Sequence, residues 1–361
     1  ILIMLLVNQL SKKSIFQTKV YVNYLLSIMF ILLAAVIILN PYTDDMERYL
    51  RVFQQISDMK WFESLTSVRW EPGFMTYQWI LSRLTKSNVV FILITAIIIW
   101  SIILFAVKKI IPYKDLPLVM FGFLSLFSFY NFSRNIIRQG IAVPLLFAMM
   151  IYLEQNNYKK ALVYFGLAIS FHISAVIGFV LFIIKKLKLS IKFLISIYIS
   201  SVIFMVTDLN QKIMSVIAAI VGGNIAESIA RYSSEAIISR YGAVNRIDFL
   251  VFTTFWIVLG IWFYNKYMNE DYLYEWLLKS YIGFSIVYIL FGFIGYSDRL
   301  AAYAWFFIPI IVFYPVIKMK SKYRLFWMIT GITINIILFL FFDVIKLYKP
   351  ISLLSLLGAV E

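Results

Sequence analysis

The chain has 361 residues, of which 62% are hydrophobic and only 14% are charged. Soluble domains carry roughly 45–50% apolar and about 25% charged residues, so this composition excludes an ordinary soluble enzyme. The net charge of +15 would favour a nucleic-acid partner in a soluble protein. In a membrane protein the same excess marks cytoplasmic loops, so we expect no nucleic-acid partner. The chain contains no cysteine, which excludes disulfides and thiolate metal sites.

Apolar runs recur along the chain, and a run of about 17–25 apolar residues can cross a bilayer as a helix. The sequence predicts an all-α polytopic integral membrane protein with about 10–12 transmembrane segments, forming a single transmembrane domain over residues 1–361. Two longer polar segments, 40–87 and 207–247, are expected on the outer, periplasmic side. The predicted spans are 21–39, 88–107, 116–130, 136–153, 161–184, 191–206, 248–264, 280–295, 300–317 and 325–342.

The run 161–184 has lysines at both of its ends. One pair precedes it at 159–160 and another follows it at 185–186. A single crossing would place one of these pairs outside, whereas lysines favour the cytoplasmic side. We therefore expect a re-entrant hairpin of two half-helices, about 161–170 and 174–184, with Phe-His-Ile-Ser at its apex. The alternative is one long helix.

Lysine and arginine sort differently under this topology. Of the 22 lysines, 17 fall in loops assigned to the inside, whereas ten of the 11 arginines fall on the outer side. Arginine is a planar, permanently charged fork that can bind phosphate or carboxylate with two parallel hydrogen bonds. The outer face is therefore expected to bind an amphiphile with an anionic head group. The alternative is that these arginines pair with nearby carboxylates as structural bridges.

The segment Ser-Arg-Asn-Ile-Ile-Arg-Gln-Gly places Arg134 and Arg138 four residues apart, a spacing that puts both on one face of a helix. Gln139 follows, and Gly140 permits close approach of a neighbouring helix or a ligand. The segment is predicted at the outer entrance of a helix, where backbone N–H groups also favour an anion. Alternatively, both arginines contact lipid head groups.

His172 is the only histidine of the chain. An ionisable residue inside the membrane is a candidate site residue, and histidine suits general-base work near neutral pH. The alternative is a buried polar group that is hydrogen-bonded to the backbone. We expect no metal site at His172, because no second histidine or cysteine exists to join it.

Three further motifs place charged residues on the predicted outer side. Glu71 opens the turn Glu-Pro-Gly-Phe, and it could be a second base or hold Arg138 in place; the plainer explanation is a helix start. Arg48, in Asp-Asp-x-x-Arg-Tyr, and Arg299, in Asp-Arg-x-x-x-Tyr, are candidate phosphate contacts. Tyr303 ends the last motif and either stacks on a sugar ring or belongs to the interfacial aromatic belt.

Taken together, the motifs resemble those of a known family. Their order resembles the EpsG-like branch of the Wzy polysaccharide polymerases, which include the O-antigen polymerases. The resemblance covers nearly the whole chain, and IRQGIA followed by FHISA is its most specific part. The motifs are D-x-x-R-Y within 44–49, EPGF at 71–74, R-x-x-I-R-Q-G-I-A at 134–142, F-H-I-S-A at 171–175 and D-R-x-x-x-Y at 298–303.

The resemblance implies a glycosyltransferase of the bacterial inner membrane whose active site faces the periplasm. It would join oligosaccharide repeat units linked to undecaprenyl diphosphate, with arginines on the pyrophosphate and a base on the acceptor sugar hydroxyl. It implies no cofactor and no metal ion, and a chain-length regulator protein is a candidate partner beside the membrane lipids. The candidate residues are His172 and Glu71 for catalysis, and Arg134, Arg138, Gln139, Arg299, Arg48 and Tyr303 for binding the pyrophosphate or substrate.

Two other functions fit the same sequence. A related glycosyltransferase would add one sugar from a polyprenyl monophosphate. A flippase or transporter of lipid-linked oligosaccharides would perform no chemistry. The absence of an internal repeat and the gathering of arginines on one side argue against a transporter. No family motif maps onto Arg231, Arg240 or Arg246.

Overall fold

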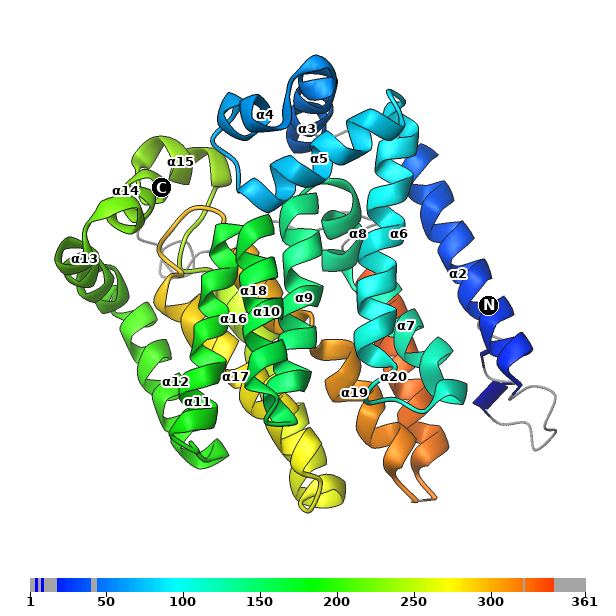
Figure 1. Cartoon of the computed structure of the whole chain (residues 1–361). Helices are drawn as coiled ribbons and strands as arrows, with labels where there is room; N and C mark the ends of the chain where they lie inside the picture. Colours follow the sequence, from blue (N-terminus) through cyan, green and yellow to red (C-terminus); the bar gives the residue numbers. More distant parts are fainter. Residues whose placement is uncertain (1–3, 6–7, 10–17, 40–43, 321, 341–361) are drawn as a thin grey trace. The chain divides into compact units, whose positions relative to one another are not determined.

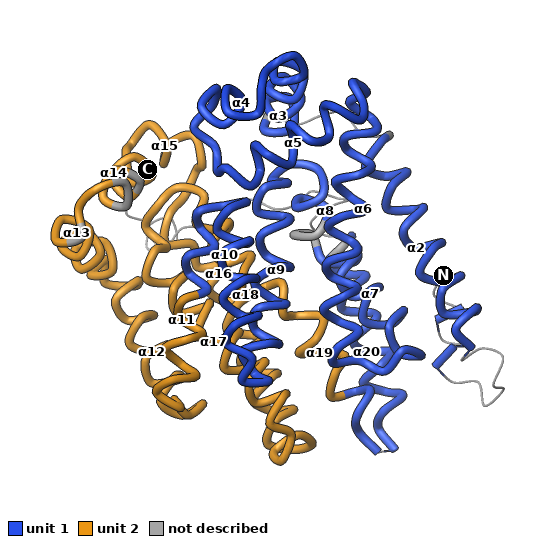
Figure 2. The backbone as a smooth tube through the Cα atoms, in the orientation of Figure 1, with its two compact units in different colours: residues 1–178, 316–344 blue, residues 179–315, 345–361 orange. Residues whose placement is uncertain are grey.

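The computed structural model describes residues 4–5, 8–9, 18–39, 44–320 and 322–340 (Figure 1). Within these ranges every regular element is a helix, which confirms the predicted all-α fold. The chain divides into two compact units, which are described separately (Figure 2). The first unit consists of residues 1–178 and 316–344, and the second of residues 179–315 and 345–361.

The first unit contains the predicted outer segment 40–87 and the motifs around Glu71, Arg138 and His172. Its elements are α2 (Lys19–Leu39), α3 (Asp44–Gln55), η2 (Ile56–Asp58), α4 (Trp61–Ser67), α5 (Pro72–Leu84), α6 (Asn88–Val107), η3 (Tyr113–Asp115), α7 (Leu116–Leu124), α8 (Phe127–Arg134), α9 (Ile137–Glu154), α10 (Tyr158–Phe171), η4 (Ile173–Gly178) and α20 (Arg324–Phe339).

The second unit contains the predicted outer segment 207–247 and the motif around Arg299. Its elements are α11 (Phe179–Lys186), α12 (Ile191–Val206), α13 (Leu209–Val221), α14 (Gly223–Tyr232), α15 (Glu235–Tyr241), α16 (Ile247–Phe263), the π-helical turn η5 (Tyr264–Met268), α17 (Tyr272–Leu290), α18 (Asp298–Trp305) and most of α19 (Ile308–Lys318).

Helix length and hydropathy make the chain a multi-pass membrane protein. Within the described ranges, five helices can cross a bilayer, or six if the bent pair α12 and α13 is one span. This is fewer than the predicted ten to twelve, because several apolar runs are divided into short helices. Run 116–130, for example, is split between α7 and α8. The five helices are Lys19–Ile38, Asn88–Val107, Ile137–Glu154, Ile247–Met268 and Asp298–Lys318.

Helix α9 is the centre of the first unit. All of its residues except Arg138 and Glu154 are buried, as expected for a helix that is apolar on every side. It packs against α6, α8, α10 and η4. Helices α3, α4 and α5 lie across the end at which α9 begins (Figure 1).

The opposite end of α9 carries lysines. Lys109, after α6, and Lys160, at the start of α10, both lie over the ring of Tyr152, at 4.8 and 5.4 Å from its centre. Tyr152 is 14 residues beyond Arg138 on α9, so these lysines are separated from Arg138 by about 20 Å of helix. Arg138 and these two lysines therefore lie at opposite ends of the buried helix, as the sequence predicts for them.

The helix break predicted at Phe-His-Ile-Ser is confirmed. Helix α10 ends at Phe171, His172 is extended with φ −155° and ψ 121°, and a short 3-10 segment follows over Ile173–Gly178. The first half-helix thus starts at Tyr158 and the second, α11, only at Phe179. Whether the two halves enter and leave on one side of the membrane stays a prediction.

The second unit contains a sharp bend that the sequence does not predict. Helices α12 and α13 meet at 100° where Asp208 adopts a left-handed φ of 54°. A buried amide network supports the bend: Asn245 Nδ2 donates to Asp208 Oδ1 at 2.7 Å, and Asn210 Nδ2 donates to Asn245 Oδ1 at 2.9 Å. The bend therefore relies on contacts between residues far apart in the sequence.

Candidate functional site

The two arginines of the 134–140 segment belong to two different helices. Arg134 is the last residue of α8, and Arg138 is the second residue of α9. The prediction that they share one helical face is therefore wrong. The chain turns between them because Asn135 and Ile136 both donate backbone hydrogen bonds to Asn131 O, at 2.8 and 3.0 Å.

Gly140 makes this turn possible. A Cβ at this position would lie 2.2 Å from the carbonyl oxygen of Phe132, far inside van der Waals contact. The predicted reason for Gly140, close approach of another helix, is thereby confirmed, with α8 as the neighbour. Arg134 is only 5% exposed, and its guanidinium lies over the ring of Tyr130 and donates to the Tyr130 hydroxyl.

Arg138 is held by three side chains from the predicted outer segment. Its Nη1 donates to Glu71 Oε2 at 2.6 Å, and its Nε approaches the Tyr49 hydroxyl at 3.4 Å. The guanidinium also lies 5.3 Å from the ring centre of Trp70, within cation–π distance. The pairing of Glu71 with Arg138 is one of the two predictions made for Glu71, and it is confirmed. Both side chains are 13% exposed, so solvent screens the pair only partly.

Glu71 also reaches the helix break. Its second oxygen, Oε1, accepts a hydrogen bond from the backbone N–H of Ile173 at 2.9 Å. This N–H belongs to the first residue of the 3-10 segment η4, and the first N–H groups of a helix have no partner within it. One carboxylate thus connects the start of α9 with the break at His172, and the motifs EPGF, IRQGIA and FHISA converge in the first unit.

Local sequence places Glu71 in this position. It is the residue before α5, and Pro72 supplies the fixed φ that suits the first helical residue. At Gly73 a Cβ would lie 2.3 Å from Ser170 Oγ, so only glycine lets the start of α5 rest on the end of α10. The helix start and the bridge to Arg138 are therefore both properties of the same turn.

The imidazole of His172 contacts Ser174 through Nδ1. The Ser174 backbone N–H donates to Nδ1 at 3.2 Å, and the Ser174 hydroxyl lies 2.7 Å from the same nitrogen. The main chain of His172 is also fixed, because its N–H donates to Ala168 O and its carbonyl accepts from Ala175 N. The ring is half-buried and belongs to a defined backbone turn.

A second arginine shares Trp70 with Arg138. Arg48 lies 5.6 Å from the ring centre of Trp70 and 3.8 Å from Asp45, and its side chain is 52% exposed. The Arg48–Asp45 pair is long and solvated, so it contributes little. Two guanidinium groups on one indole form a cationic surface. Such a surface favours an anion with more than one negative charge.

An aromatic cluster supports these arginines. The ring of Tyr49 packs edge-on against Trp70 and Phe74, with ring centres 5.2 and 5.4 Å apart. Tyr77, one turn along α5, bonds Thr95 of α6 at 2.6 Å. Burial raises the pKa of Tyr77, so this tyrosine stays neutral and acts as an anchor between α5 and α6.

The remaining predicted residues have other settings. Gln139 is fully buried within α9. Arg299 and Tyr303 belong to α18 in the second unit, where Arg299 lies 4.8 Å from the ring centre of Tyr296 and Tyr303 is buried. Over the described residues, no three side chains among histidine, aspartate and glutamate are grouped as a metal ion would need.

In the second unit, a carboxylate partner accounts for Arg246, onto which no family motif maps. Arg246 is 4% exposed and forms a two-bond pair with Asp248, Nε to Oδ1 at 3.2 Å and Nη2 to Oδ2 at 2.6 Å. It also covers the ring of Phe249. Burial raises the pKa of the nearby Tyr241, with Asp298 adding to the effect. The structural alternative for the outer arginines, pairing with carboxylates, is thus confirmed for Arg246, for Arg138 and weakly for Arg48.

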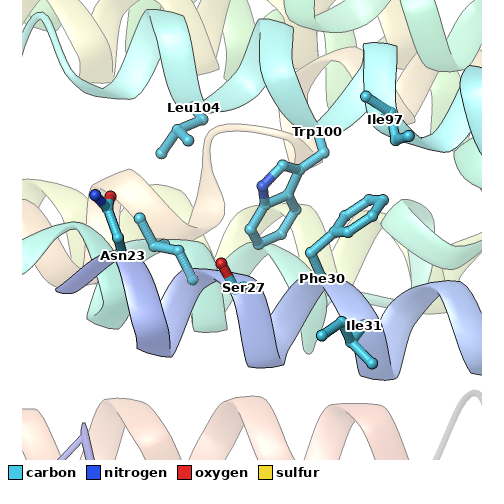
Figure 3. Close-up of a pocket in the computed structure, with 8 residues that line it drawn as sticks. Asn23, Ser27, Phe30, Ile31, Ile97, Trp100 and Leu104 are labelled. Carbon is cyan, nitrogen blue, oxygen red and sulfur yellow. The ribbon is translucent and has the colours of Figure 1, made fainter. Parts of the chain in front are cut away.

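An apolar groove of about 420 Å³ lies between α2 and α6 (Figure 3). Its walls include Phe30 and Trp100, whose ring centres are 5.9 Å apart. It opens along two helices that can span the membrane, so its surroundings suit a hydrocarbon chain. The lining residues are Asn23, Leu26, Ser27, Phe30, Ile31, Ile97, Trp100 and Leu104.

Sequence reasoning missed three contributors to the site. Trp70 precedes the EPGF motif, Tyr49 ends the D-x-x-R-Y motif, and Ser174 belongs to FHISA. Each lies next to a predicted residue, so adjacency was an available signal. The ring contacts of Trp70 and the hydrogen bonds of Ser174 depend on the fold.

A comparison with known protein families matches residues 23–354 to the model of the EpsG family. Neither the curated proteins nor the solved structures gave a match to the chain. The family match covers both units and includes every candidate site residue.

Proposed function

The chain belongs to the EpsG family, and on this premise we propose that it is a polysaccharide polymerase of the Wzy type. It joins oligosaccharide repeat units carried on undecaprenyl diphosphate at the periplasmic face of the bacterial inner membrane. The observation that carries the proposal is the cationic surface of Arg138 and Arg48 on Trp70, tied by Glu71 to the break at His172.

The charge of this surface suits a pyrophosphate. Arg138 keeps one guanidinium nitrogen, Nη2, without a hydrogen-bond acceptor among the described residues, while Glu71 and Tyr49 orient the rest of the fork. The N-terminal end of α9 adds backbone N–H groups and a favourable dipole. We assign Arg138 and Arg48 to the pyrophosphate, with Arg134 and Gln139 as further binding residues of the first unit. Arg299 and Tyr303, which belong to the second unit, stay candidate substrate contacts.

The reaction requires two events at the donor sugar. The acceptor hydroxyl oxygen forms a bond to the anomeric carbon, and the bond from that carbon to the phosphate oxygen breaks, with its electron pair leaving on the pyrophosphate. Arginines hold the charge that develops on the leaving group, an electrostatic effect that is usually the largest single contribution. The acceptor proton must pass to a base, and the site offers His172 and Glu71.

The carrier lipid requires an apolar surface as well. A polyprenyl tail remains in the membrane while its head group reacts, so apolar grooves between spanning helices would hold it. The α2–α6 groove shows that the first unit offers such surfaces (Figure 3). This requirement separates the proposed substrate from a soluble sugar nucleotide.

The test is polymerisation in proteoliposomes supplied with one purified undecaprenyl-diphosphate-linked repeat unit. A ladder of products supports the polymerase. A single addition from a polyprenyl-phosphate sugar would support the simpler glycosyltransferase, and lipid transfer between leaflets without a new glycosidic bond would support a flippase. Either of the last two results would overturn the proposal.

A matched pair of variants tests the site itself. Arg138→Ala is expected to lower the polymerisation rate by at least about 100-fold, the typical effect of removing a group that stabilises developing charge. Arg51→Ala is the control, because Arg51 is an exposed arginine on α3, within one turn of Arg48. Equal rates for the two variants would remove Arg138 from the reaction.

A further inference from the structure

The hydrogen bonds around His172 determine which ring nitrogen carries the proton. A backbone N–H can only donate, so the Ser174 N–H at 3.2 Å requires an unprotonated Nδ1. The proton of a neutral imidazole must then be on Nε2. The Ser174 hydroxyl, 2.7 Å from Nδ1, donates to the same nitrogen in this tautomer. An imidazolium would place a second donor against the Ser174 N–H and is disfavoured.

Two hydrogen bonds from consecutive N–H groups fix the backbone at the helix break. The N–H of Ile173 points to Glu71 Oε1, and the next N–H, of Ser174, points to His172 Nδ1. Rotating the imidazole by half a turn would remove both donors from Nδ1. The backbone turn therefore determines the tautomer, because the N–H and the hydroxyl of Ser174 both donate to Nδ1.

We propose that Ser174 is a positioning residue that fixes His172 as the Nε2–H tautomer, and that His172 serves the reaction as a hydrogen-bond donor. The role of donor rests on the proposed function, whereas the tautomer does not. In this tautomer Nε2 already holds a proton and cannot accept one from the acceptor hydroxyl. His172 instead donates to an oxygen of the substrate pyrophosphate, next to the arginines.

The proton balance then assigns the base. The acceptor O–H bond breaks, its oxygen bonds the anomeric carbon, and its proton passes to the carboxylate of Glu71. The pyrophosphate leaves with the electron pair of the broken bond, held by Arg138 and by the Nε2–H of His172. The pyrophosphate binds at Nη2 of Arg138, so Glu71 keeps its contact with Nη1 and lies beside the reacting groups when it accepts the proton.

The tautomer can be observed without activity, because His172 is the only histidine in the sequence. Protein labelled with 15N-histidine and carrying no histidine tag gives ring signals from one residue. The protonated nitrogen is expected to couple to both ring carbon-bound protons, as Nε2 does, and not to one alone, as Nδ1 does. Ser174→Ala keeps the backbone N–H but loses the hydroxyl donor, so it should raise the share of the Nδ1–H tautomer without making it the sole form, and Ser174→Thr, which keeps the hydroxyl, should restore the original signal.

Ser170→Ala is the matched control for Ser174→Ala. Ser170 lies in the last turn of α10, two residues before His172, and its hydroxyl donates to Leu167 O within that helix. Its removal should leave the His172 signals unchanged. A proton on Nδ1 in the unmodified protein, or an unchanged tautomer in Ser174→Ala, would overturn the inference.

The proposed donor role of His172 predicts different polymerisation rates for two substitutions at this position. A glutamine amide can donate a hydrogen bond but cannot act as a base, whereas alanine can do neither. His172→Gln should keep polymerisation within about 10-fold of the unmodified rate, while His172→Ala should lose about 100-fold. Equal losses in both variants would return His172 to the role of base. If no variant and no unmodified protein forms polymer while the 15N signals are as expected, the proposed function fails and the tautomer stands.

Discussion

At the scale of residues, Glu71 has two partners that lie far apart in the sequence. Oε2 binds the guanidinium of Arg138 and Oε1 accepts the N–H of Ile173. The two contacts differ chemically, because the first needs a negative charge and the second needs only an acceptor oxygen. Substitutions at this one position can therefore separate the electrostatic contribution from the hydrogen bond.

Glu71→Gln is expected to destabilise the protein less than Glu71→Ala. The amide oxygen of glutamine can still accept from Ile173, whereas alanine leaves both Ile173 N–H and Arg138 without Glu71. A hydrogen bond to a charged group contributes about 1.5–3 kcal/mol, which sets the scale for the loss in Glu71→Ala. Both variants should lose polymerisation, because neither retains the carboxylate base.

The melting temperature of purified protein in detergent measures the stability difference. Glu63→Gln is the control, because Glu63 accepts from the Lys60 N–H at an exposed helix start outside the site. It should preserve polymerisation. Identical melting temperatures for Glu71→Ala and the unmodified protein would show that Glu71 does not hold the break.

The residue-level predictions from sequence succeeded where chemistry alone constrained the partner. A buried arginine needs an anion, so pairing of Arg138 with Glu71 could be foreseen from their residue types. The tautomer of His172 could not, because it depends on the direction of the Ser174 N–H, which only the backbone conformation sets. The spacing of apolar residues along the sequence does not indicate in which direction a backbone N–H points.

At the scale of elements, the site is assembled from interruptions in helices. The first unit places one break at Asn135–Ile136, another at His172, and the start of α5 at Glu71 against them. Lysine positions predicted the break at His172. The predicted span 136–153 begins at the break between α8 and α9, but the i, i+4 spacing of the two arginines wrongly placed Arg134 on the same helix. The close contact of Gly140 with Phe132, which only the fold shows, decides it.

Gly140→Ala tests this break. The added methyl group would lie 2.2 Å from Phe132 O, so α8 and α9 must separate. We expect a loss of about 1–3 kcal/mol, the usual cost of overpacking, together with reduced polymerisation because Arg138 shifts with α9. The melting temperature and the polymerisation rate of the purified variant are the measurements.

Gly166→Ala is the matched control for Gly140→Ala. Gly166 lies within α10, and a Cβ there meets no atom within 4 Å. Alanine is favoured over glycine in a helix by about 1 kcal/mol, so the variant should be at least as stable as the unmodified protein. If Gly140→Ala behaved like Gly166→Ala, the tight turn between α8 and α9 would be wrong.

At the scale of the whole molecule, the predicted separation of arginine from lysine can be followed along one helix. In the first unit Arg138 and the lysines at Tyr152 lie at opposite ends of α9. Because lysines favour the cytoplasmic side, the end of α9 that carries Arg138 is predicted to face outward, where a guanidinium could bind substrate. The number of continuous spans was predicted less well, since hydropathy detects apolar runs but not the short helices into which packing divides them.

The side on which each loop lies can be tested directly, because the sequence contains no cysteine that would have to be removed. Single cysteines at exposed positions can be labelled in intact cells with a maleimide that does not cross the membrane. Arg69→Cys, between α4 and α5, is expected to react from outside. Lys159→Cys and Lys186→Cys, which flank the broken helix, should both react only after the membrane is permeabilised.

The two lysine positions decide between a re-entrant hairpin and a single crossing. A hairpin returns the chain to the side it came from, so both cysteines share one side. Its half-helix α10 has 14 residues, or about 21 Å of rise, which is less than the roughly 30 Å of a full hydrocarbon core. Labelling of Lys186→Cys from outside, with Lys159→Cys protected, would mean that the chain crosses the membrane here and that the His172 break lies within a span. Protection of both would place that break at the tip of a hairpin, on a turn open to the outer side where Arg138 and Glu71 meet it.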